Sequence, residues 1–334
     1  KYWLAYIHAK QNKTFTADLA AANSAAPDFV FPFRNMDFEV FEWATKQSSH
    51  WKPKYYLALL LKDRNKVAQS KAIFTSLQGE PDYAPFYATR AALLMTETTQ
   101  ASALTATIAD LNKAILLDKN QWRYIKTLTE LYNNQFAFMK ALEVVAPYYK
   151  AHTDNYIIGM LYAKTLIHNK QYETADKLLA TLNIIPFEGA TIGHELYREA
   201  KLMQALVQLQ EKNYTAALNF INEAKLWPEN LGAGKPYESD IDNRLEQYMQ
   251  YVCLKQLNKL DSAQALLKKI TAFKPGIYNT IRNFQAANNL ITKWAYNELH
   301  ESFDWNAWMQ TQINKYPQFK ETFMWVLNKS IRGR

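Results

Sequence analysis

The sequence of 334 residues has little glycine and a single cysteine, and each shortage limits what the chain can be. Its 8 glycines are too few for the many tight turns of a sheet-rich enzyme or a phosphate-cradling fold. Cys253 alone excludes an internal disulfide and a cysteine metal cluster, and we expect it to be a buried helix residue. The longest uninterrupted apolar run, Tyr55 to Leu61, is far shorter than the ~20 residues that span a bilayer.

Arginine is also scarce, and the net charge of +8 is unevenly distributed. Only 9 of the 39 basic residues are arginine, the residue favoured for bidentate phosphate and base contacts. Residues 251–334 carry 12 basic and 5 acidic side chains, whereas the first 250 residues are almost balanced. This pattern favours solvated lysine faces or an acidic protein partner and disfavours nucleic acid.

A period of 34 residues is the strongest feature that is present. Thr107, Ala141 and Ala175 follow one another at that spacing (141 − 107 = 34, 175 − 141 = 34), and Ala217 and Ala263 continue the series with longer gaps. Small side chains allow two helices to approach closely, and a fixed period of this length is typical of stacked two-helix units.

The residues around these positions complete the pattern of a helix pair. Residues 122–153 have Ile125 and Leu128 at helical spacing on one predicted helix, and Val145 and Tyr148 beside Ala141 on the next. Such units resemble tetratricopeptide repeats. The resemblance implies an all-α chain, a right-handed α-solenoid of antiparallel helix pairs with two long inter-repeat loops and an aromatic-rich C-terminal cap.

We expect three regions along the chain: degenerate N-terminal helical repeats in residues 1–100, regular repeats in 101–275, and capping helices in 276–334. The early repeats are predicted from small or apolar residues at helical spacing, namely Ala5, Ala17, Leu59, Ala68 and Ala72. Pro275 suits the end of a helix. The predicted cap is crowded with aromatic residues: Trp294, Trp305, Trp308, Phe319, Phe323 and Trp325. A terminal repeat lacks a neighbour and needs such a cover, although an aromatic platform for a sugar is the alternative.

Two inserts interrupt the regular spacing, near residues 185–195 and 227–242. Insertions in repeat arrays often lie on the binding face, and successive ones should emerge near each other. The candidate binding residues in them are Glu188, His194, Trp227, Glu229, Asn230 and Lys235. Trp227 either stacks on a ligand or pins its own loop.

Familiar catalytic motifs in the inserts are incomplete. His194-Glu195 starts like the zinc motif H-E-x-x-H, but Arg198 stands where the second histidine is needed. Lys235 follows two glycines as in a phosphate loop, but Pro236 takes the place of Ser or Thr. Acidic residues cluster there too, which suits glycoside hydrolysis only if two carboxylates are held about 5–10 Å apart. We expect no metal and no cofactor.

The repeat register also predicts which side chains line the groove of the solenoid. These are Arg123, Lys126, Glu130 and Asn133 on one helix and Met160 and Lys164 on the next. The mixture of charged and apolar side chains suits contact with a protein.

A closer resemblance extends over about residues 25–275. The segments are similar to those of a group of large bacterial proteins, in which a β-rich, mutarotase-like N-terminal half precedes a tetratricopeptide half. The matching stretches are 31–34, 54–59, 84–91, 186–190, 194–197 and 227–236, with Arg244-Leu245. The resemblance implies an exported protein, with Arg34, Arg90 and the insert residues facing the partner domain or a shared ligand. Arg34 or Arg90 is further expected to pair with a buried carboxylate such as Glu188.

From these observations we expect a non-catalytic scaffold that binds protein, most simply another domain of its parent chain. The first residue is lysine rather than methionine, which is consistent with a piece of a longer protein. Two alternatives stay open: the accessory or catalytic half of a carbohydrate-processing enzyme, and a glycan-binding surface protein.

Overall fold

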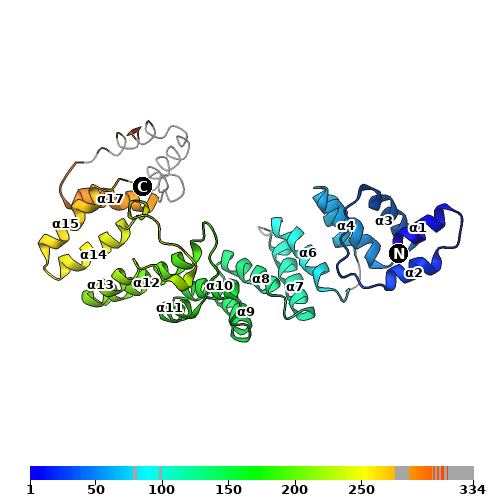
Figure 1. Cartoon of the computed structure of the whole chain (residues 1–334), viewed down its shortest axis with the longest axis horizontal. Coiled ribbons are helices and arrows are strands. Elements are labelled where there is room, and N and C mark those ends of the chain that lie inside the picture. Colours follow the sequence, from blue (N-terminus) through cyan, green and yellow to red (C-terminus); the bar gives the residue numbers. More distant parts are fainter. Residues whose placement is uncertain are drawn as a thin grey trace. The chain divides into compact units, whose positions relative to one another are not determined.

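The computed structural model describes residues 1–77, 81–97, 100–274, 286–302, 304, 307, 310, 311 and 314, and within these ranges the regular elements are helices without a strand (Figure 1). The α-helices are α1 (Tyr2–Lys10), α2 (Thr16–Ser24), α3 (Asn35–Gln47), α4 (Trp51–Asp63), α5 (Val67–Ser76), α6 (Ala84–Leu94), α7 (Ala101–Leu117), α8 (Trp122–Asn134), α9 (Phe138–Ala151), α10 (Tyr156–His168), α11 (Tyr172–Thr181), α12 (Ile192–Gln210), α13 (Tyr214–Glu223), α14 (Arg244–Gln256), α15 (Leu260–Thr271) and α17 (Ala286–Glu298). Short 3₁₀ turns lie at Met95–Glu97, Glu229–Leu231 and Glu238–Asp240. Over the same ranges, none of these helices is both long and apolar enough to cross a membrane.

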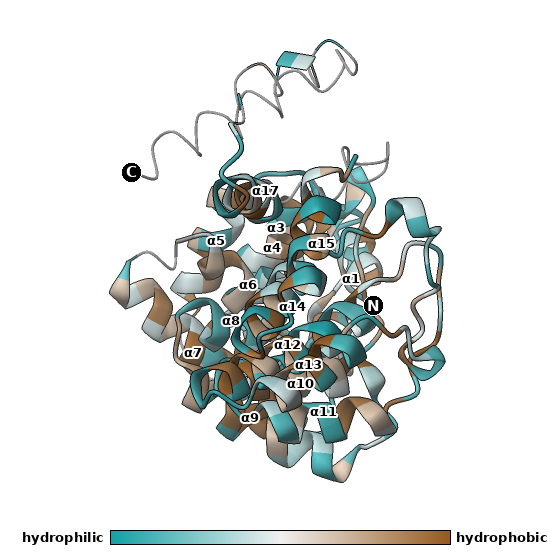
Figure 2. Cartoon of the chain, turned by 90° about the vertical axis from the view of Figure 1, so that its left-hand side faces the viewer, coloured by the Kyte–Doolittle hydropathy of each residue, from teal (hydrophilic) through white to brown (hydrophobic). Residues whose placement is uncertain are grey.

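The chain divides into two compact units, residues 1–134 and 135–334. Within each unit, helices that follow one another in sequence pack together: α4 with α5 and α6 with α7 in the first, α10 with α11, α12 with α13 and α14 with α15 in the second. Hydrophobic and hydrophilic residues share the same helices (Figure 2), as expected of helices that bury one side in a stack. This is the predicted all-α architecture of antiparallel helix pairs.

The small residues of the 34-residue period are buried, as predicted. Thr107, Ala141, Ala175 and Ala217 are fully buried, and Ala263 is nearly so. Their burial explains the period, because a larger side chain at these positions would separate the packed helices. Cys253 is buried as well, as expected, and burial raises the pKa of its thiol to about 11.

Three of the small residues predicted to mark the early repeats are exposed, so the register predicted there was wrong. Ala17, Ala68 and Ala72 face solvent, whereas Ala5 is buried. The buried small residue on α5 is Ser70, whose Oγ donates a hydrogen bond of 2.7 Å to the carbonyl oxygen of Ala58. A hydroxyl that is satisfied in this way can replace alanine at a close helix contact, which a search for alanine overlooks.

The turns of four helix pairs, α4/α5, α10/α11, α12/α13 and α14/α15, share one geometry. Asn65, Lys170, Lys212 and Asn258 follow the first helix of their pairs with φ between 56° and 63°. The next amide donates to the carbonyl oxygen five residues earlier, for example Asn213 N to Gln208 O at 2.8 Å. This is the Schellman arrangement that ends many helices, built here without glycine.

The expected regions 1–100, 101–275 and 276–334 stay a prediction. Pro275 and the aromatic residues Trp305, Trp308, Phe319, Phe323 and Trp325 lie outside the described residues. Trp294 of α17 does lie within them, and its ring packs against that of Tyr248 on α14, with centroids 5.6 Å apart.

Candidate functional site

The two long loops of the second unit are packed against each other. We call residues 182–191, between α11 and α12, the first insert, and residues 224–243, between α13 and α14, the second insert. The amide of Ile184 donates to the carbonyl oxygen of Asn230 at 2.8 Å. The Asn230 side chain in turn donates to the carbonyl oxygens of Leu179 and Leu182, at 3.0 and 2.8 Å. Asn230 therefore fixes the second insert to the end of α11, and it does so with its own amide rather than offering it to a ligand.

Two glycines make this close approach possible. A Cβ atom on Gly193 would lie 2.3 Å from the carbonyl oxygen of Leu231, so only glycine fits there. Gly232 has φ +67°, and a Cβ atom there would lie 2.7 Å from the carbonyl oxygen of Ile184. These glycines bring the inserts together. Gly234, the other glycine of the supposed phosphate loop, has open space around it.

His194 and Trp227 form the centre of the joined inserts. Their rings are stacked, with centroids 3.4 Å apart and planes 6° from parallel. His194 lies in the first turn of α12 and is 8% exposed, and Trp227 is half-buried. Burial and the positive charge of Arg198 lower the pKa of His194 to about 4, so its ring is neutral at pH 7. Trp227 thus pins its own loop, one of the two roles predicted for it.

Arg198, which replaces the second histidine of the zinc motif, has a structural partner. Its guanidinium forms a bidentate ion pair with Glu246 of α14, a fully buried carboxylate; the Nη2–Oε2 distance is 2.9 Å. Next to it, Asp242 binds Arg244 through both carboxylate oxygens and accepts a hydrogen bond of 2.8 Å from Asn288. These pairs hold α12, α14 and α17 together and leave the arginines and their carboxylates occupied. In the described part of the chain, no group of three or more His, Cys, Asp or Glu side chains is placed to hold a metal ion.

A small pocket of about 140 Å³ lies between the inserts and these ion pairs. Its wall contains Thr191, His194, Glu195, Arg198, Ala224, Lys225, Trp227, Pro236, Asp240, Ile241, Asp242, Asn243 and Asn288. A pocket of this size is too small for a drug-sized ligand, which needs about 300 Å³ or more. It can hold the tip of one side chain.

Several large apolar side chains on or next to the inserts are exposed. Ile185, Phe187, Ile192, Leu226 and Tyr237 are all more than half exposed, and Tyr237 reaches 84%. We call these five residues the insert surface. Four of them lie on the inserts, and Ile192 is the first residue of α12. Exposed apolar side chains on loops that are tied to the scaffold and to each other are typical of an interaction site.

The other candidate residues of the inserts lie at their periphery. Glu188 and Glu229 are exposed, and Lys235 forms an exposed ion pair of 2.6 Å with Glu238. The expectation that Glu188 is a buried carboxylate was wrong, because the first insert carries it outward.

Arg34 and Arg90 belong to the first unit and have local roles there. Arg90 forms a bidentate ion pair with Asp110, at 2.6 and 2.8 Å, which joins α6 to α7. The backbone amide of Arg34 donates to Asp37 at 2.9 Å at the start of α3, and its guanidinium lies 5.5 Å from the ring of Phe33.

The predicted groove residues differ in accessibility. On α8, Arg123 is exposed, and Lys126 and Glu130 pair with each other at 2.8 Å, one turn apart. Asn133, expected on the same surface, is buried. On α10, Met160 is half-buried and Lys164 is exposed. The register that predicts the groove is therefore least accurate at the end of α8.

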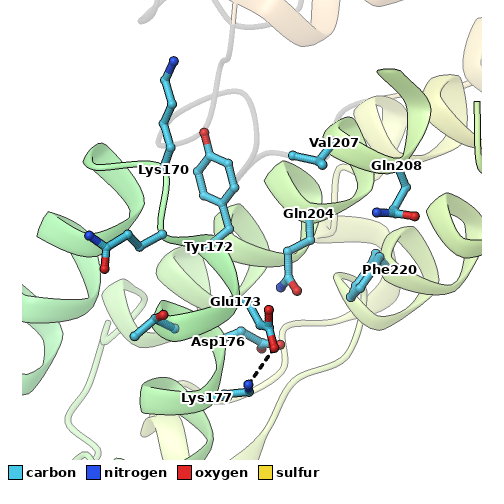
Figure 3. Close-up of a pocket in the computed structure, with 11 residues that line it drawn as sticks. Lys170, Tyr172, Glu173, Asp176, Lys177, Gln204, Val207, Gln208 and Phe220 are labelled. Atoms are coloured by element: carbon cyan, nitrogen blue, oxygen red, sulfur yellow. Dashed lines mark hydrogen bonds and ion pairs between the residues drawn. The ribbon is translucent and has the colours of Figure 1, made fainter. Parts of the chain in front are cut away.

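The second unit, residues 135–334, also contains a groove larger than the pocket between the inserts, and the sequence did not predict it. It encloses about 660 Å³ between the turn at Lys170, the start of α11, and α12 and α13 (Figure 3). Tyr172, Val207 and Phe220 supply its apolar lining, and Gln204 and Gln208 supply amides. Its carboxylates are already paired, Glu173 with Lys177 and Asp176 with Lys201. The side chains come from three helices, and no sequence motif links them.

Comparison with known proteins is consistent with this fold. No protein-family model and no curated protein matches the chain. Among solved structures, it is similar to the C-terminal part of a TPR repeat-containing protein from Cytophaga hutchinsonii, with a TM-score of 0.50 and 14% identity over 85% of this chain and 100% of that chain. A tetratricopeptide repeat protein from Parabacteroides merdae matches with a TM-score of 0.37 and 11% identity over 87% and 95% of the two chains. The structure of Naa15/Naa10 bound to HypK-THB matches with a TM-score of 0.48 and 15% identity; there the match covers 84% of this chain but only 39% of the other.

The identity in these comparisons is low, so they show the fold alone. Together with the helix pairs and their buried small residues, the match to the Cytophaga hutchinsonii structure defines a tetratricopeptide-like helical-repeat fold.

Proposed function

We propose that this chain is a non-catalytic helical-repeat scaffold that binds a protein, a neighbouring domain of the same parent polypeptide, through the insert surface. The observation that carries the proposal is the joining of the two inserts. Asn230 bonds to the end of α11, and Gly193 and Gly232 allow backbone contact, so the loops are held in one arrangement before any partner binds. Binding to a surface ordered in advance costs less conformational entropy.

The chemistry of the insert surface supports a protein partner. Burying apolar surface contributes about 25 cal/mol per Å², and aromatic side chains such as Phe187 and Tyr237 are enriched among the residues that dominate binding. Both are largely exposed at present.

The chemistry beneath that surface argues against catalysis. Arg198 and Arg244 are saturated by carboxylates, and His194 is stacked on Trp227 with a pKa of about 4, which makes it a weak base. A general acid or base that acts near neutral pH needs a pKa close to 7, and the pKa of His194 lies well below that value.

Site-specific photocross-linking in the full-length parent protein tests the proposal. A benzophenone amino acid at Phe187 or Tyr237 should cross-link to a segment outside this chain. The same probe at Phe136, which is equally exposed but lies outside the inserts, should not. Cross-linking from position 136 alone, or from none of the three, would overturn it.

A narrower proposal is that the parent is a larger, exported, carbohydrate-related bacterial protein. It rests on the sequence resemblance between residues 25–275 and the large bacterial proteins with a mutarotase-like half. An exposed ring favours the alternative of direct glycan binding, because Tyr237 offers a face on which a sugar could stack. Screening the isolated chain on a glycan array, with Tyr237→Ala and Trp227→Ala as variants, separates the two: binding lost in Tyr237→Ala supports the glycan alternative.

A further inference from the structure

The loop between α2 and α3, in the first unit, exposes a dense group of apolar side chains. Phe31, Phe33 and Met36 are all more than half exposed, and Phe29 is 92% exposed. We call these four residues, which lie within eight positions of one another, the phenylalanine segment. A ring that is 92% exposed has almost no neighbours, so the loop projects from the unit and is not part of a flat face.

The backbone presents Phe29 at a position that suits a different residue. Residues 27–30 form a turn, in which the amide of Val30 donates to the carbonyl oxygen of Pro27 at 3.3 Å. Phe29 is the third residue of this turn and has φ +57°, a conformation for which glycine or asparagine is preferred. The turn therefore does not account for a phenylalanine, and neither does packing within the chain, because the ring is exposed. Contact with something outside the chain does account for it.

The rest of the phenylalanine segment is fixed to the first unit by polar bonds. Asp37 Oδ2 accepts from the amides of Phe33 and Arg34, at 3.1 and 2.9 Å. Arg64 Nη2 donates to the carbonyl oxygen of Phe33 at 2.7 Å. Asp37 is buried and also accepts from the indole of Trp3, at 2.9 Å. The segment is therefore ordered before it binds anything, which lowers the entropic cost of binding.

Cations lie beside the exposed rings. The guanidinium of Arg34 lies 5.5 Å from the ring of Phe33, and Arg64 is bonded to the backbone of that same residue. Arg64 belongs to the turn between α4 and α5, and this turn also carries lysines. The exposed charged residues of 28–36 and 62–67 are Arg34, Lys62, Arg64 and Lys66 against Asp28 and Asp63, a balance of +4 − 2 = +2. Projecting apolar side chains with net positive charge next to them are complementary to an apolar phase with an anionic surface.

We propose that the phenylalanine segment inserts into the surface of an anionic lipid membrane, with its phenyl rings among the acyl chains and the neighbouring cations at the lipid phosphates. Separate rings that project from a loop suit a fluid that closes around each of them, whereas a protein partner would have to offer a pocket to each ring. Each lysine or arginine near an anionic membrane adds to the attraction. The attachment is peripheral and needs no helix that spans the bilayer. It is independent of the insert surface, which belongs to the second unit.

Co-sedimentation of the chain with lipid vesicles tests the proposal. The vesicles contain phosphatidylcholine and phosphatidylglycerol in equal amounts, and we expect binding that weakens when NaCl is raised to about 0.5 M. Phe29→Ser and Phe31→Ser should each lower the partition coefficient about tenfold, because each removes one buried phenyl ring from the bound state. Phe136→Ser is the matched control, since Phe136 is 81% exposed and has φ +56° but lies outside the segment. It should bind as the unmodified chain does.

The charge requirement is tested by a second pair of variants. Lys62→Gln/Lys66→Gln should weaken binding to the mixed vesicles at least about fivefold, since each lysine contributes to the attraction by anionic lipid. Lys140→Gln/Lys150→Gln removes the same charge from exposed positions of α9 and should have little effect. On vesicles of phosphatidylcholine alone, the two double variants should not differ.

Three results would contradict the proposal. They are no binding to the mixed vesicles, an equal loss in Phe136→Ser, and a loss in Phe187→Ser, which would place the lipid contact at the inserts. A benzophenone amino acid at Phe31 that cross-links to protein and not to lipid, in the full-length parent with vesicles present, would identify a protein partner instead. Cross-linking from Phe187 tests the protein-binding function separately, so either proposal can fail without the other.

Discussion

The imidazole of His194 lies flat against the indole of Trp227, and this contact ties the first turn of α12 to the second insert. The stack excludes water from one side of the histidine, and the guanidinium of Arg198 further disfavours a second positive charge. As a result, the native protein holds this ring neutral at a pH at which an unfolded chain would begin to protonate it.

The first prediction concerns stability against pH. The pKa of His194 is about 4 in the folded chain and about 6.5 unfolded, so between these values the unfolded state binds more protons. Stability therefore falls as the pH drops from about 6.5 to about 4, by up to about 3 kcal/mol from this residue. Chemical denaturation at several pH values, compared between the unmodified chain and His194→Gln, isolates its share.

The variant supplies its own control. The neighbouring charged groups Arg198, Lys225, Asp240, Asp242 and Glu246 are present in both proteins, so their contributions largely cancel in the difference. The difference in unfolding free energy should shrink as the pH falls. A constant difference across the range would contradict the assigned pKa.

The second prediction concerns the attachment of the inserts. Asn230→Ala removes two hydrogen bonds and leaves the carbonyl oxygens of Leu179 and Leu182 unsatisfied, which should cost about 1–3 kcal/mol. Hydrogen exchange should rise at the amide of Ile184, which bonds to the backbone of residue 230. Asn222→Ala, at an exposed position of α13, should leave that amide protected; equal exchange in both variants would remove the structural role given to Asn230.

The sequence predicts the helix pairs well because their determinants are local. Ala175 and Ala217 are small because two helices meet there, and the same requirement recurs from one helix pair to the next. The prediction fails at Ser70, where a hydroxyl bonded to the carbonyl oxygen of Ala58 takes the place of alanine.

For the candidate site, the sequence predicted which residues belong to it better than it predicted which of them contact one another. His194 and Trp227 are both among the predicted residues, but their stacking depends on how two inserts about 30 residues apart fold against each other. Likewise, Arg90 pairs with Asp110 and Arg198 with Glu246, and no spacing rule joins either pair. Contacts between distant segments are decided by tertiary packing, which a single sequence does not display.

The third prediction tests the close helix contact at the repeated alanine. Ala175→Leu adds volume at a fully buried point of α11 and should destabilise the chain by about 1–3 kcal/mol. Ala180→Leu, an identical change on the same helix at an exposed position, should alter stability by no more than about 0.5 kcal/mol. Urea denaturation of both variants gives the comparison. Equal effects would mean that residue 175 is not a contact point.

The fourth prediction uses the turn that recurs in four of the helix pairs. Lys212 has φ +63°, a left-handed conformation that costs a residue with a Cβ atom roughly 1–2 kcal/mol. Glycine lacks this strain but loses more chain entropy on folding, so Lys212→Gly should stabilise the chain by about 0.5–1 kcal/mol. Lys177→Gly, within the exposed face of α11, should instead destabilise it by about 1 kcal/mol, because glycine is a poor helix residue. Thermal or urea denaturation gives the change in unfolding free energy of each variant. Changes of opposite sign would establish that the turn, rather than the loss of a lysine charge, governs the effect. A loss of stability in both variants would refute this explanation.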